Sequence, residues 1–363
     1  LEDVLHCPVD RIVLMGEGRI LYNGDPDSLL CGELLQAGGI REPLYVTALK
    51  YAGVALTPDM QVSRLKELKL SPEQREQVVR WFHAQKEPPQ EEKQKELLRA
   101  ENIDFTYDGG HHALKGISLR IDQGEMLSIV GTNGAGKSTF SKVLCGFETP
   151  QKGSLTMDGE DLSRYSIKER ADFIGYVMQN PNQMISKTKI FDEVALGLVN
   201  RGAAPEEIQT RVEAVLKTCG LYPFRNWPVS ALSYGQKKRV TIASILVLEP
   251  KIILLDEPTA GQDLHHYTQI MDFLAELNRK GTTVVLITHD MHLMLEYTPR
   301  AVVFHDGRVI ADASAAQVLN SREIVETAHL KETSLYHLAN LCGIEEREEF
   351  TRRFIAADRE ARR

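Results

Sequence analysis

The chain has 363 residues, of which 42% are hydrophobic and 26% are charged. These proportions are ordinary for a globular protein with one large domain and flanking pieces, or with two small domains. The formal net charge of −8 argues against a general nucleic-acid binder, whose surface is basic. The five cysteines are scattered without CxxC spacing, which excludes a disulfide framework or zinc site and fits a reducing cytosol.

Two segments near the ends of the chain repeat one another. Residues 11–20 read RIVLMGEGRI and residues 300–310 read RAVVFHDGRVI, and they align when Gly18 is paired with Gly307. Each segment is typical of a hairpin of two short strands turned at an acidic residue followed by glycine. Such hairpins are common, but the order of charged and apolar residues favours a true repeat. We therefore expect residues 1–40 to be the C-terminal tail of an earlier, missing copy of the following domain.

Residues 41–96 are predicted to be a helical linker. Residues 43–53 indicate one short helix. A second helix begins at Ser71, which caps it, with proline at the first position and Gln74 reaching back. The nearly balanced charge of the segment favours a surface spacer over a ligand-binding module. Residues 87–96 are charged and contain two prolines, which predicts a flexible connection.

A phosphate-binding loop is predicted from Gly131 to Thr139. The segment fits the pattern of Gly, four residues, Gly, Lys, then Ser or Thr. It lies between a predicted strand over 126–130 and a predicted helix over 139–144, so a helix N-terminus and backbone N–H groups face the phosphates. Lys137 is expected to reach the β- and γ-phosphates, and Ser138 to hold Mg²⁺. The predicted nucleotide-binding residues of this loop are Gly131, Thr132, Asn133, Gly134, Ala135, Gly136, Lys137, Ser138 and Thr139.

Two carboxylates end a predicted buried strand over 252–257. At the carboxyl end of a strand beside a phosphate loop, Asp256 is expected to orient Mg²⁺ through its water shell. Glu257 is expected to polarise the attacking water. Paired acids also begin ordinary turns, so the prediction depends on the loop in the same domain.

Three further side chains are candidates for this site. His289 ends the predicted strand over 282–288, and from there it would donate a hydrogen bond to the γ-phosphate or hold the water. Gln179 similarly follows the predicted strand over 174–178. Tyr107 is a candidate for stacking on the purine. The alternatives are a structural histidine, a surface amide and a core tyrosine.

Residues 232–236 are predicted to begin a helix that runs to Leu248, with Ser233 as its cap. The free N–H groups and positive dipole end of such a helix make a second anion site. An ordinary capped helix is the alternative, and the residues alone do not specify the anion.

The remaining organisation follows from the alternation of elements. Strands and helices alternate over 97–330, which predicts an α/β domain. Residues 331–363 are predicted to form two amphipathic helices packed on that domain, with docking of a partner as the alternative. Their apolar residues are Leu335, Leu338, Leu341, Phe350 and Phe354.

The ordered set of motifs over 97–330 resembles the nucleotide-binding domain of ATP-binding-cassette (ABC) ATPases. The matching motifs are the Walker A loop (131–139), the Q-loop glutamine (Gln179), the signature (232–236), Walker B with the catalytic glutamate (252–257), the D-loop (260–263) and the switch histidine (His289). Tyr234 stands where the family usually has Gly, and Gln262 where Leu is common. Neither change removes a catalytic group.

The resemblance implies an α/β P-loop NTPase fold of the ABC type: a RecA-like core with an antiparallel β subdomain and a helical signature subdomain. It implies binding of ATP and Mg²⁺, with Ser138, Gln179 and Asp256 toward the metal and Gln179, Glu257 and His289 in catalysis. In this family two such domains close head to tail. Ser233, Gly235 and Gln236 are therefore expected to contact nucleotide on a second ABC module, either the missing N-terminal cassette or another copy.

Within the family, the sequence Gln179-Asn180-Pro181 followed by 192–195 and 261–263 is similar to ATPases of energy-coupling factor importers, which take up vitamins and metal ions. The inferred tandem form is most similar to the type linked to thiamine or its hydroxymethylpyrimidine precursor. This implies a peripheral subunit at the cytoplasmic face of the membrane, with integral membrane partners and without nucleic acid. The alternative is a soluble tandem-cassette factor that acts on ribosomes, although such proteins carry a long basic helical arm where residues 41–96 are charge-balanced.

Overall fold

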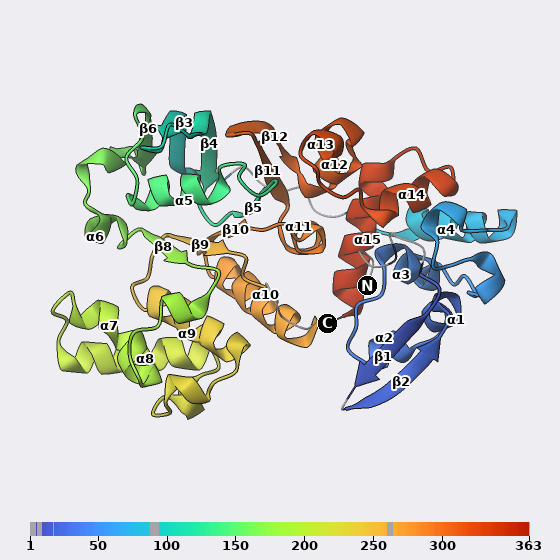
Figure 1. Cartoon of the computed structure of the whole chain (residues 1–363), viewed down its shortest axis with the longest axis horizontal. Helices are drawn as coiled ribbons and strands as arrows, with labels where there is room; N and C mark the ends of the chain where they lie inside the picture. Colours follow the sequence, from blue (N-terminus) through green and yellow to red (C-terminus); the bar gives the residue numbers. More distant parts are fainter. Residues whose placement is uncertain (1–4, 6–8, 17, 88–93, 260–263, 363) are drawn as a thin grey trace.

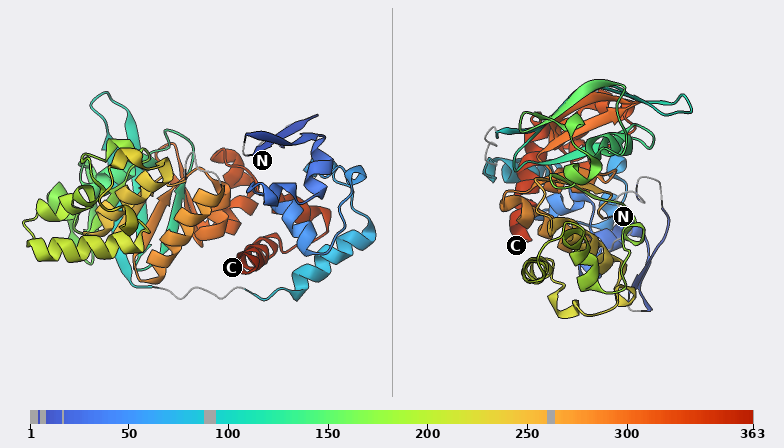
Figure 2. Two further views of the ribbon diagram at one scale, coloured as in Figure 1. Left: turned by 90° about the horizontal axis from the view of Figure 1, so that it is seen from below. Right: turned by 90° about the vertical axis from the view of Figure 1, so that its left-hand side faces the viewer.

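The structure is a computed structural model that describes residues 5, 9–16, 18–87, 94–259 and 264–362. Figures 1 and 2 show an α/β body beside a mainly helical part, to which both ends of the chain contribute. The proline pair of the predicted linker and the D-loop segment 260–263 lie outside the described residues.

The body is built on a six-stranded sheet in the order β12-β11-β5-β10-β9-β8. Its strands are β5 (Met126–Val130), β8 (Ile174–Val177), β9 (Ile252–Asp256), β10 (Thr283–Ile287), β11 (Arg300–His305) and β12 (Arg308–Ser314). All neighbours pair in parallel except β12, which is antiparallel to β11. Strands β5 and β10 are buried along their whole length, which explains their continuous apolar runs. Because parallel strands end at one edge, the polar residues after them gather there.

A second, antiparallel sheet lies over one face of the first. It contains β3 (Glu96–Thr106), β4 (His112–Asp122), β6 (Lys152–Met157) and β7 (Glu160–Asp161), in the order β4-β3-β6-β7. Helix α5 (Lys137–Cys145) packs in the core between the two sheets, where the Phe140 and Phe304 ring centroids are 5.6 Å apart. Helix α6 (Ile167–Arg170) follows β7.

Helices cover the rest of the body. They are α7 (Ile190–Val199), α8 (Pro205–Thr218), α9 (Tyr234–Leu246), α10 (Leu264–Arg279) and α11 (Met291–Tyr297). The first three share a core of their own and form a helical subdomain, at the lower left of Figure 1. The predicted architecture of an α/β core, an antiparallel β subdomain and a helical subdomain is therefore confirmed, although α9 ends at Leu246 rather than Leu248.

The helical part, here called the terminal helical unit, combines both ends of the chain. Its helices are α1 (Pro26–Cys31), α2 (Leu34–Ala37), α3 (Leu44–Tyr51), α4 (Pro72–Ala84), α12 (Ala315–Asn320), α13 (Arg322–Thr327), α14 (Ser334–Leu341) and α15 (Arg347–Ala361). One hydrophobic core joins them, with Tyr51 and Phe354 ring centroids 6.1 Å apart. Ser71 caps α4 as predicted, and the tail forms two helices. The interpretation of 41–96 as a surface spacer was wrong, because its apolar residues are part of this core.

The repeat predicted from the sequence is also visible in the structure. Strands β1 (Ile12–Gly16) and β2 (Arg19–Gly24) form a hairpin. A shift of 289 residues carries this hairpin and α1, α2 and α3 onto β11, β12, α12, α13 and α14. The backbone N–H of Tyr45 donates to Ser334 Oγ at 3.3 Å across a separation of 289 residues, so equivalent positions of the two copies meet. This correspondence supports a true repeat.

Candidate active site

The predicted phosphate loop connects β5 to α5, and glycine is required at its bends. Gly131 has φ 142°, and a Cβ there would lie 2.1 Å from the backbone oxygen of Phe304. Gly136 has φ 104°, and its Cβ would lie 2.7 Å from the backbone oxygen of Ala113. Both positions combine a left-handed backbone with close approach of another chain segment, which only glycine accepts.

Helix α5 offers its first turn to an anion. Its N-cap is Gly136, which has no side chain to satisfy the N–H groups of that turn, so they remain available to phosphate oxygens. The Lys137 ammonium donates to the backbone oxygens of Gly131 at 2.6 Å and Thr132 at 2.9 Å. Burial lowers the pKa of Lys137, although the carboxylates of Glu257 and Asp256 oppose this shift. A phosphate would supply the negative partner that this cation needs.

The predicted magnesium ligands fall at the same edge of the sheet. Ser138 Oγ donates to Asp256 Oδ2 at 3.5 Å, and the Tyr176 hydroxyl donates to the same oxygen at 3.1 Å. Gln179 is exposed and lies just beyond β8, the neighbour of β9. A hydroxyl, a carboxylate and an amide are oxygen donors of the kind that Mg²⁺ prefers. These residues therefore fit the metal that the resemblance implies.

Glu257 and His289 form a hydrogen-bonded pair beside the loop. Glu257 Oε1 and His289 Nδ1 are 2.6 Å apart, and Thr288 Oγ1 donates to Glu257 Oε2 at 3.4 Å. Glu257 has φ 45°, a left-handed conformation that a non-glycine residue adopts at an energetic cost and that is common at active sites. Its side chain is 12% exposed and that of His289 is 72% exposed. The pair therefore joins a shielded carboxylate to an exposed imidazole.

This edge faces a cavity of about 870 Å³ between the body and the terminal helical unit. Glu257 and His289 line it together with residues of the phosphate loop. The lining residues of the loop are Gly131, Thr132 and Asn133. The cavity brings the loop and the predicted catalytic pair into one space, as the parallel strand ends require.

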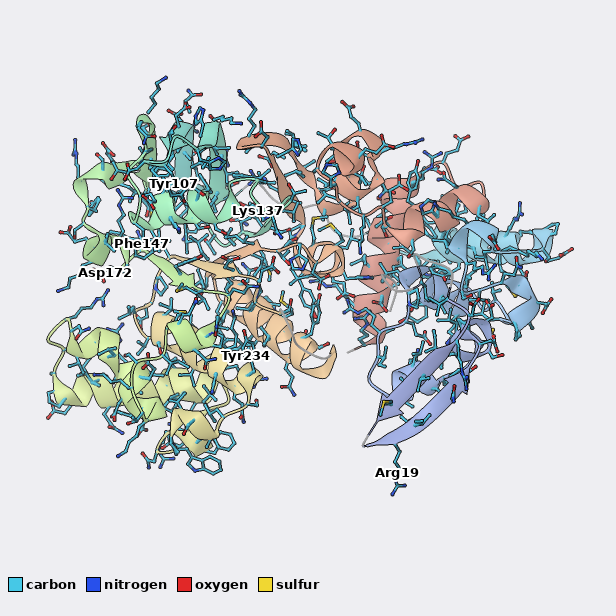
Figure 3. All side chains as sticks on the ribbon, in the orientation of Figure 1. Arg19, Tyr107, Lys137, Phe147, Asp172 and Tyr234 are labelled. Atoms are coloured by element: carbon cyan, nitrogen blue, oxygen red, sulfur yellow. The ribbon has the colours of Figure 1, made fainter. Side chains whose placement is uncertain are left out.

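Tyr107 lies next to the same loop. Its hydroxyl is 3.2 Å from Thr139 Oγ1, and its ring packs edge-on against Phe105 with centroids 4.8 Å apart. The ring is half-buried, so both core packing and stacking on a purine remain compatible with its position. Figure 3 shows Tyr107 close to the part of the body that holds Lys137.

The signature residues lie in the helical subdomain, away from the loop of the same chain. Ser233 caps α9: its Oγ accepts from Gln236 N at 3.3 Å, and Gln236 Oε1 accepts from Ser233 N at 3.0 Å. With Gly235 they line a cavity of about 360 Å³, which the described phosphate-loop residues do not line. In Figure 3 the neighbouring Tyr234 lies on the helical subdomain, below Lys137. The structure thus does not bring the two predicted anion sites together within one chain.

Lys238 is a residue that the sequence reasoning missed. Its ammonium is buried and donates to the backbone oxygens of Met178 at 2.8 Å and Gln179 at 2.9 Å. The available signal was helical spacing, because Lys238 lies on the same face of α9 as the buried Thr241 and Ile242. A lysine at such a position indicates a specific partner, since ammonium groups are otherwise rarely buried.

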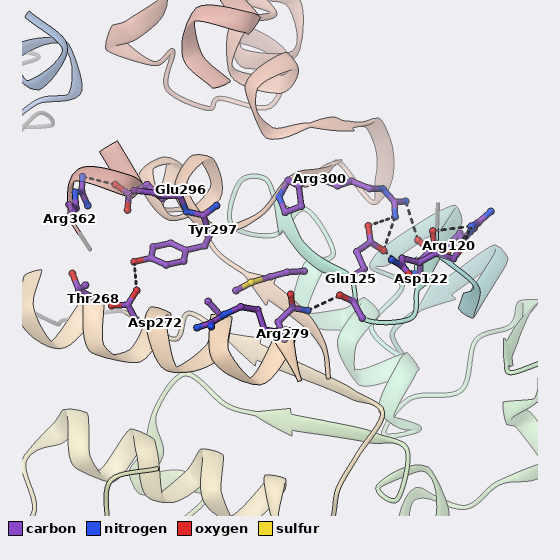
Figure 4. A pocket seen from close by; sticks show the side chains of 17 residues that line it. Arg120, Asp122, Glu125, Thr268, Asp272, Arg279, Glu296, Tyr297, Arg300 and Arg362 are labelled. Carbon is purple, nitrogen blue, oxygen red and sulfur yellow. Dashed lines mark hydrogen bonds and ion pairs between the residues drawn. The ribbon is translucent and has the colours of Figure 1, made fainter. Parts of the chain in front are cut away.

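A larger cavity of about 1120 Å³ lies at the amino ends of the strands, near Met126 and Arg300 (Figure 4). Its charges are largely paired with one another: Arg300 donates to Glu125 at 2.8 Å, and the Tyr297 hydroxyl donates to Asp272 at 3.4 Å. None of the predicted site residues in the described part of the chain line it. It is therefore separate from the candidate active site.

Comparison with protein families gives three matches. The family described as ABC transporter matches residues 114–260, and one described as ATP-binding cassette cobalt transporter matches residues 32–105. An AAA domain family, described as a putative AbiEii toxin of a type IV toxin–antitoxin system, matches residues 225–296. The first match contains the phosphate loop and Glu257, and the second contains helices α2, α3 and α4 of the terminal helical unit.

Similar proteins agree with these families. Putative ABC transporter ATP-binding proteins of Clostridium perfringens and Enterococcus faecalis are 54% and 57% identical to this chain over its whole length. The chain spans 64% of the length of each of these relatives.

Two solved structures are similar to the body. CbiO1 of Clostridium perfringens, described as part of the ABC transporter complex cbiONQ, is 34% identical with a TM-score of 0.60, covering 68% of this chain and 100% of its own. The ATP-binding cassette MJ0796, a dimer bound to ADP and phosphate, is 34% identical with a TM-score of 0.55, covering 60% and 99%. Among the described residues, no helix is both long and apolar enough to cross a membrane. The similarity to these two cassettes and to the ABC transporter family model shows that the chain belongs to the ABC transporter family, as an ATP-binding protein.

Proposed function

We propose that this chain binds and hydrolyses ATP with Mg²⁺, and that hydrolysis drives uptake of a solute through separate integral membrane subunits. The observation that carries this proposal is the Glu257–His289 pair at 2.6 Å, at the same sheet edge as the phosphate loop. A loop without a proton acceptor would support binding alone. A shielded carboxylate beside the loop supports hydrolysis.

Each residue has a distinct part in the proposed reaction. The N–H groups of the loop and Lys137 bind the phosphates, and Lys137 exchanges its present carbonyl partners for phosphate oxygens. Ser138, Asp256 and Gln179 would hold Mg²⁺, which neutralises phosphate charge when bound. Glu257 accepts a proton from the attacking water, and His289 donates a hydrogen bond to the charge that develops on the γ-phosphate.

A second ABC module completes the site in this proposal. Ser233, Gly235 and Gln236 would cover nucleotide held by that module, because they lie away from the loop of their own chain. The repeat suggests that the module is a cassette whose tail is residues 1–40. The exposure of the first hairpin supports this proposal. Val13 and Met15 are 49% and 67% exposed, whereas Val302 and Phe304, the residues 289 positions later, are fully buried in the sheet beside β5. Pairing of two copies of this chain is the alternative arrangement.

The proposal for the membrane partners and the solute draws on the comparisons. The similarity to a cobalt-transporter family over 32–105 and to cbiO1 favours an importer of the energy-coupling factor type, peripheral to the cytoplasmic face of the membrane. We propose a divalent metal ion as the solute. Thiamine or its hydroxymethylpyrimidine precursor is the second candidate, favoured only by the repeat. The matched proteins are transporter components, which favours this function over a ribosome-associated factor.

Glu257→Gln tests the reaction. The full-length protein with this change should bind ATP as the wild type does, while hydrolysis falls by about 10²- to 10⁴-fold because the proton acceptor is lost. Glu206→Gln, at an exposed site in the first turn of α8, is the matched control and should hydrolyse normally. Undiminished hydrolysis by Glu257→Gln would overturn the assignment. Purification from membranes should also recover an integral membrane protein, and recovery with ribosomes instead would favour the other function.

A further inference from the structure

The signature helix α9 is tied to the segment after β8 by side chains of its first two turns. The Tyr234 hydroxyl donates to the backbone oxygen of Gln179 at 3.2 Å. The Lys238 ammonium donates to the same oxygen at 2.9 Å and to the backbone oxygen of Met178 at 2.8 Å. Lys237 Nζ donates to Asn182 Oδ1 at 3.4 Å. The Gln179 carbonyl thus accepts two hydrogen bonds from one helix.

Lys238 also reaches the strand that carries the predicted magnesium ligand. Its Nζ is 3.5 Å from the backbone oxygen of Asp256, so three backbone oxygens surround the ammonium. The residue is 1% exposed, and an ammonium without partners at such a depth would be strongly unfavourable. Its three N–H groups match three carbonyls. The arrangement is therefore a specific junction of α9, β8 and β9, and not incidental packing.

Tyr234 stands at the end of the helix that would meet the second module. It directly follows Ser233, the cap that is proposed to cover nucleotide held elsewhere. A displacement of α9 would move Tyr234 and Lys238 together, because both lie on one rigid helix. Both side chains donate to the backbone oxygen of Gln179, whose side chain is proposed to face the metal of its own module.

We propose that Tyr234 and Lys238 are positioning residues that couple the two ATP sites. When the N-terminus of α9 engages nucleotide on the second module, they shift the Gln179 backbone and the end of β9, and so adjust the magnesium ligands of their own module. This inference rests on the proposed function, and it adds a route by which nucleotide binding at one ATP site changes the magnesium ligands of the other.

Tyr234→Phe is the sharpest test, because it removes one hydroxyl from a half-exposed ring and leaves the fold intact. ATP hydrolysis by the full-length protein in its membrane complex would be measured against ATP and against Mg²⁺. We expect the Hill coefficient for ATP to fall toward one, and the half-saturating Mg²⁺ concentration to rise about 2- to 10-fold. Lys238→Met should also lower the Hill coefficient toward one, and it should raise the half-saturating Mg²⁺ concentration by at least about 10-fold.

Tyr222→Phe is the matched control. It removes a hydroxyl that donates to Glu213 inside the helical subdomain, and it should leave both quantities unchanged. The coupling would be overturned if Tyr234→Phe kept the cooperativity and the Mg²⁺ dependence of the wild type. It would also be overturned if the wild type itself showed no cooperativity, or if Tyr222→Phe changed as much as Tyr234→Phe. Binding of a fluorescent ATP analogue separates the two proposals. If the wild type fails to bind it, the proposed function fails, whereas normal binding with unchanged variants defeats the coupling alone.

Discussion

Helices α5 and α9 both begin in turns that contain glycine, and both present an N-terminus to solvent, yet they begin differently. The N-cap of α5 is Gly136 at positive φ, so the first turn keeps its N–H groups for an external anion. The N-cap of α9 is Ser233, whose side chain and that of Gln236 already satisfy each other's backbone N–H groups. Only α5 has the Glu257–His289 pair beside it.

This difference indicates that the N-termini of α5 and α9 have different functions. An uncapped first turn and a buried lysine need a phosphate to complete them, which suits a region that binds and hydrolyses nucleotide. A capped turn needs nothing further, but the Ser233 hydroxyl accepts a bond from Gln236 N and still has its hydrogen to donate. Such a region suits a cover that closes over nucleotide bound elsewhere.

Gly131→Ala should disable the α5 region most severely. The added Cβ would lie 2.1 Å from the Phe304 oxygen, at φ 142°. Overpacking and backbone strain together should lower the free energy of unfolding by about 2–5 kcal/mol and abolish ATP binding. Gly134→Ala is the control. Nothing lies within 4 Å of its Cβ, at φ 83°, so the free energy of unfolding should fall by only about 1–2 kcal/mol. Urea unfolding measures both, and equal losses would contradict the steric explanation.

Lys137→Met should weaken ATP binding without weakening the unliganded fold. Loss of charge-assisted hydrogen bonds to phosphate should lower the affinity about 10- to 150-fold, as measured by equilibrium titration. The free energy of unfolding without ATP should not fall, because burial disfavours this ammonium. Lys217→Met, at an exposed position in the helical subdomain, should bind ATP normally. A large loss of unliganded stability in Lys137→Met would show a structural lysine instead.

Lys238 should make stability depend on pH. Burial lowers its pKa to about 8, against the attraction of Asp256 and Glu257. Between that pH and the usual lysine range the unfolded chain holds a proton that the folded chain has released, so stability rises with pH. Relative to Lys238→Gln, the free energy of unfolding should rise by about 2 kcal/mol from pH 7 to pH 9.5. Unfolding titrations at both pH values measure this, and a constant difference would contradict it.

Ser233→Ala and Ser233→Asp should distinguish the capping of α9 by Ser233 from the proposed contact of Ser233 with nucleotide on the second module. The alanine variant loses the cap, which costs about 0.5–2 kcal/mol. The aspartate variant keeps the cap but places a carboxylate against phosphate. Both should bind ATP at the loop of their own chain, and hydrolysis should fall most in the aspartate variant. Unchanged hydrolysis in Ser233→Asp would show that the N-terminus of α9 is not part of the ATP site.

The local parts of this fold were predictable because their causes are local. Ser71 with Gln74 and Ser233 with Gln236 form capping boxes whose members are three residues apart, so the pattern specifies the helix start. The positions of Asp256, Glu257 and His289 were predictable for a related reason. Parallel strands end at one edge, so residues that follow apolar runs meet there.

Tertiary structure alone decided the contacts between distant segments. Lys238 lies 60 residues from Met178, and no local pattern specifies which carbonyls a helical lysine will meet. The apolar residues of α3 and α4 allow a spacer or a core, and only packing against α14 and α15 places them inside. Val13 and Val302 occupy equivalent places in two hairpins, but the first is exposed and the second is buried. Sequence determined which segments form strands, helices and turns; the neighbour that each apolar face meets decided its burial, because burial depends on contacts that only the folded chain creates.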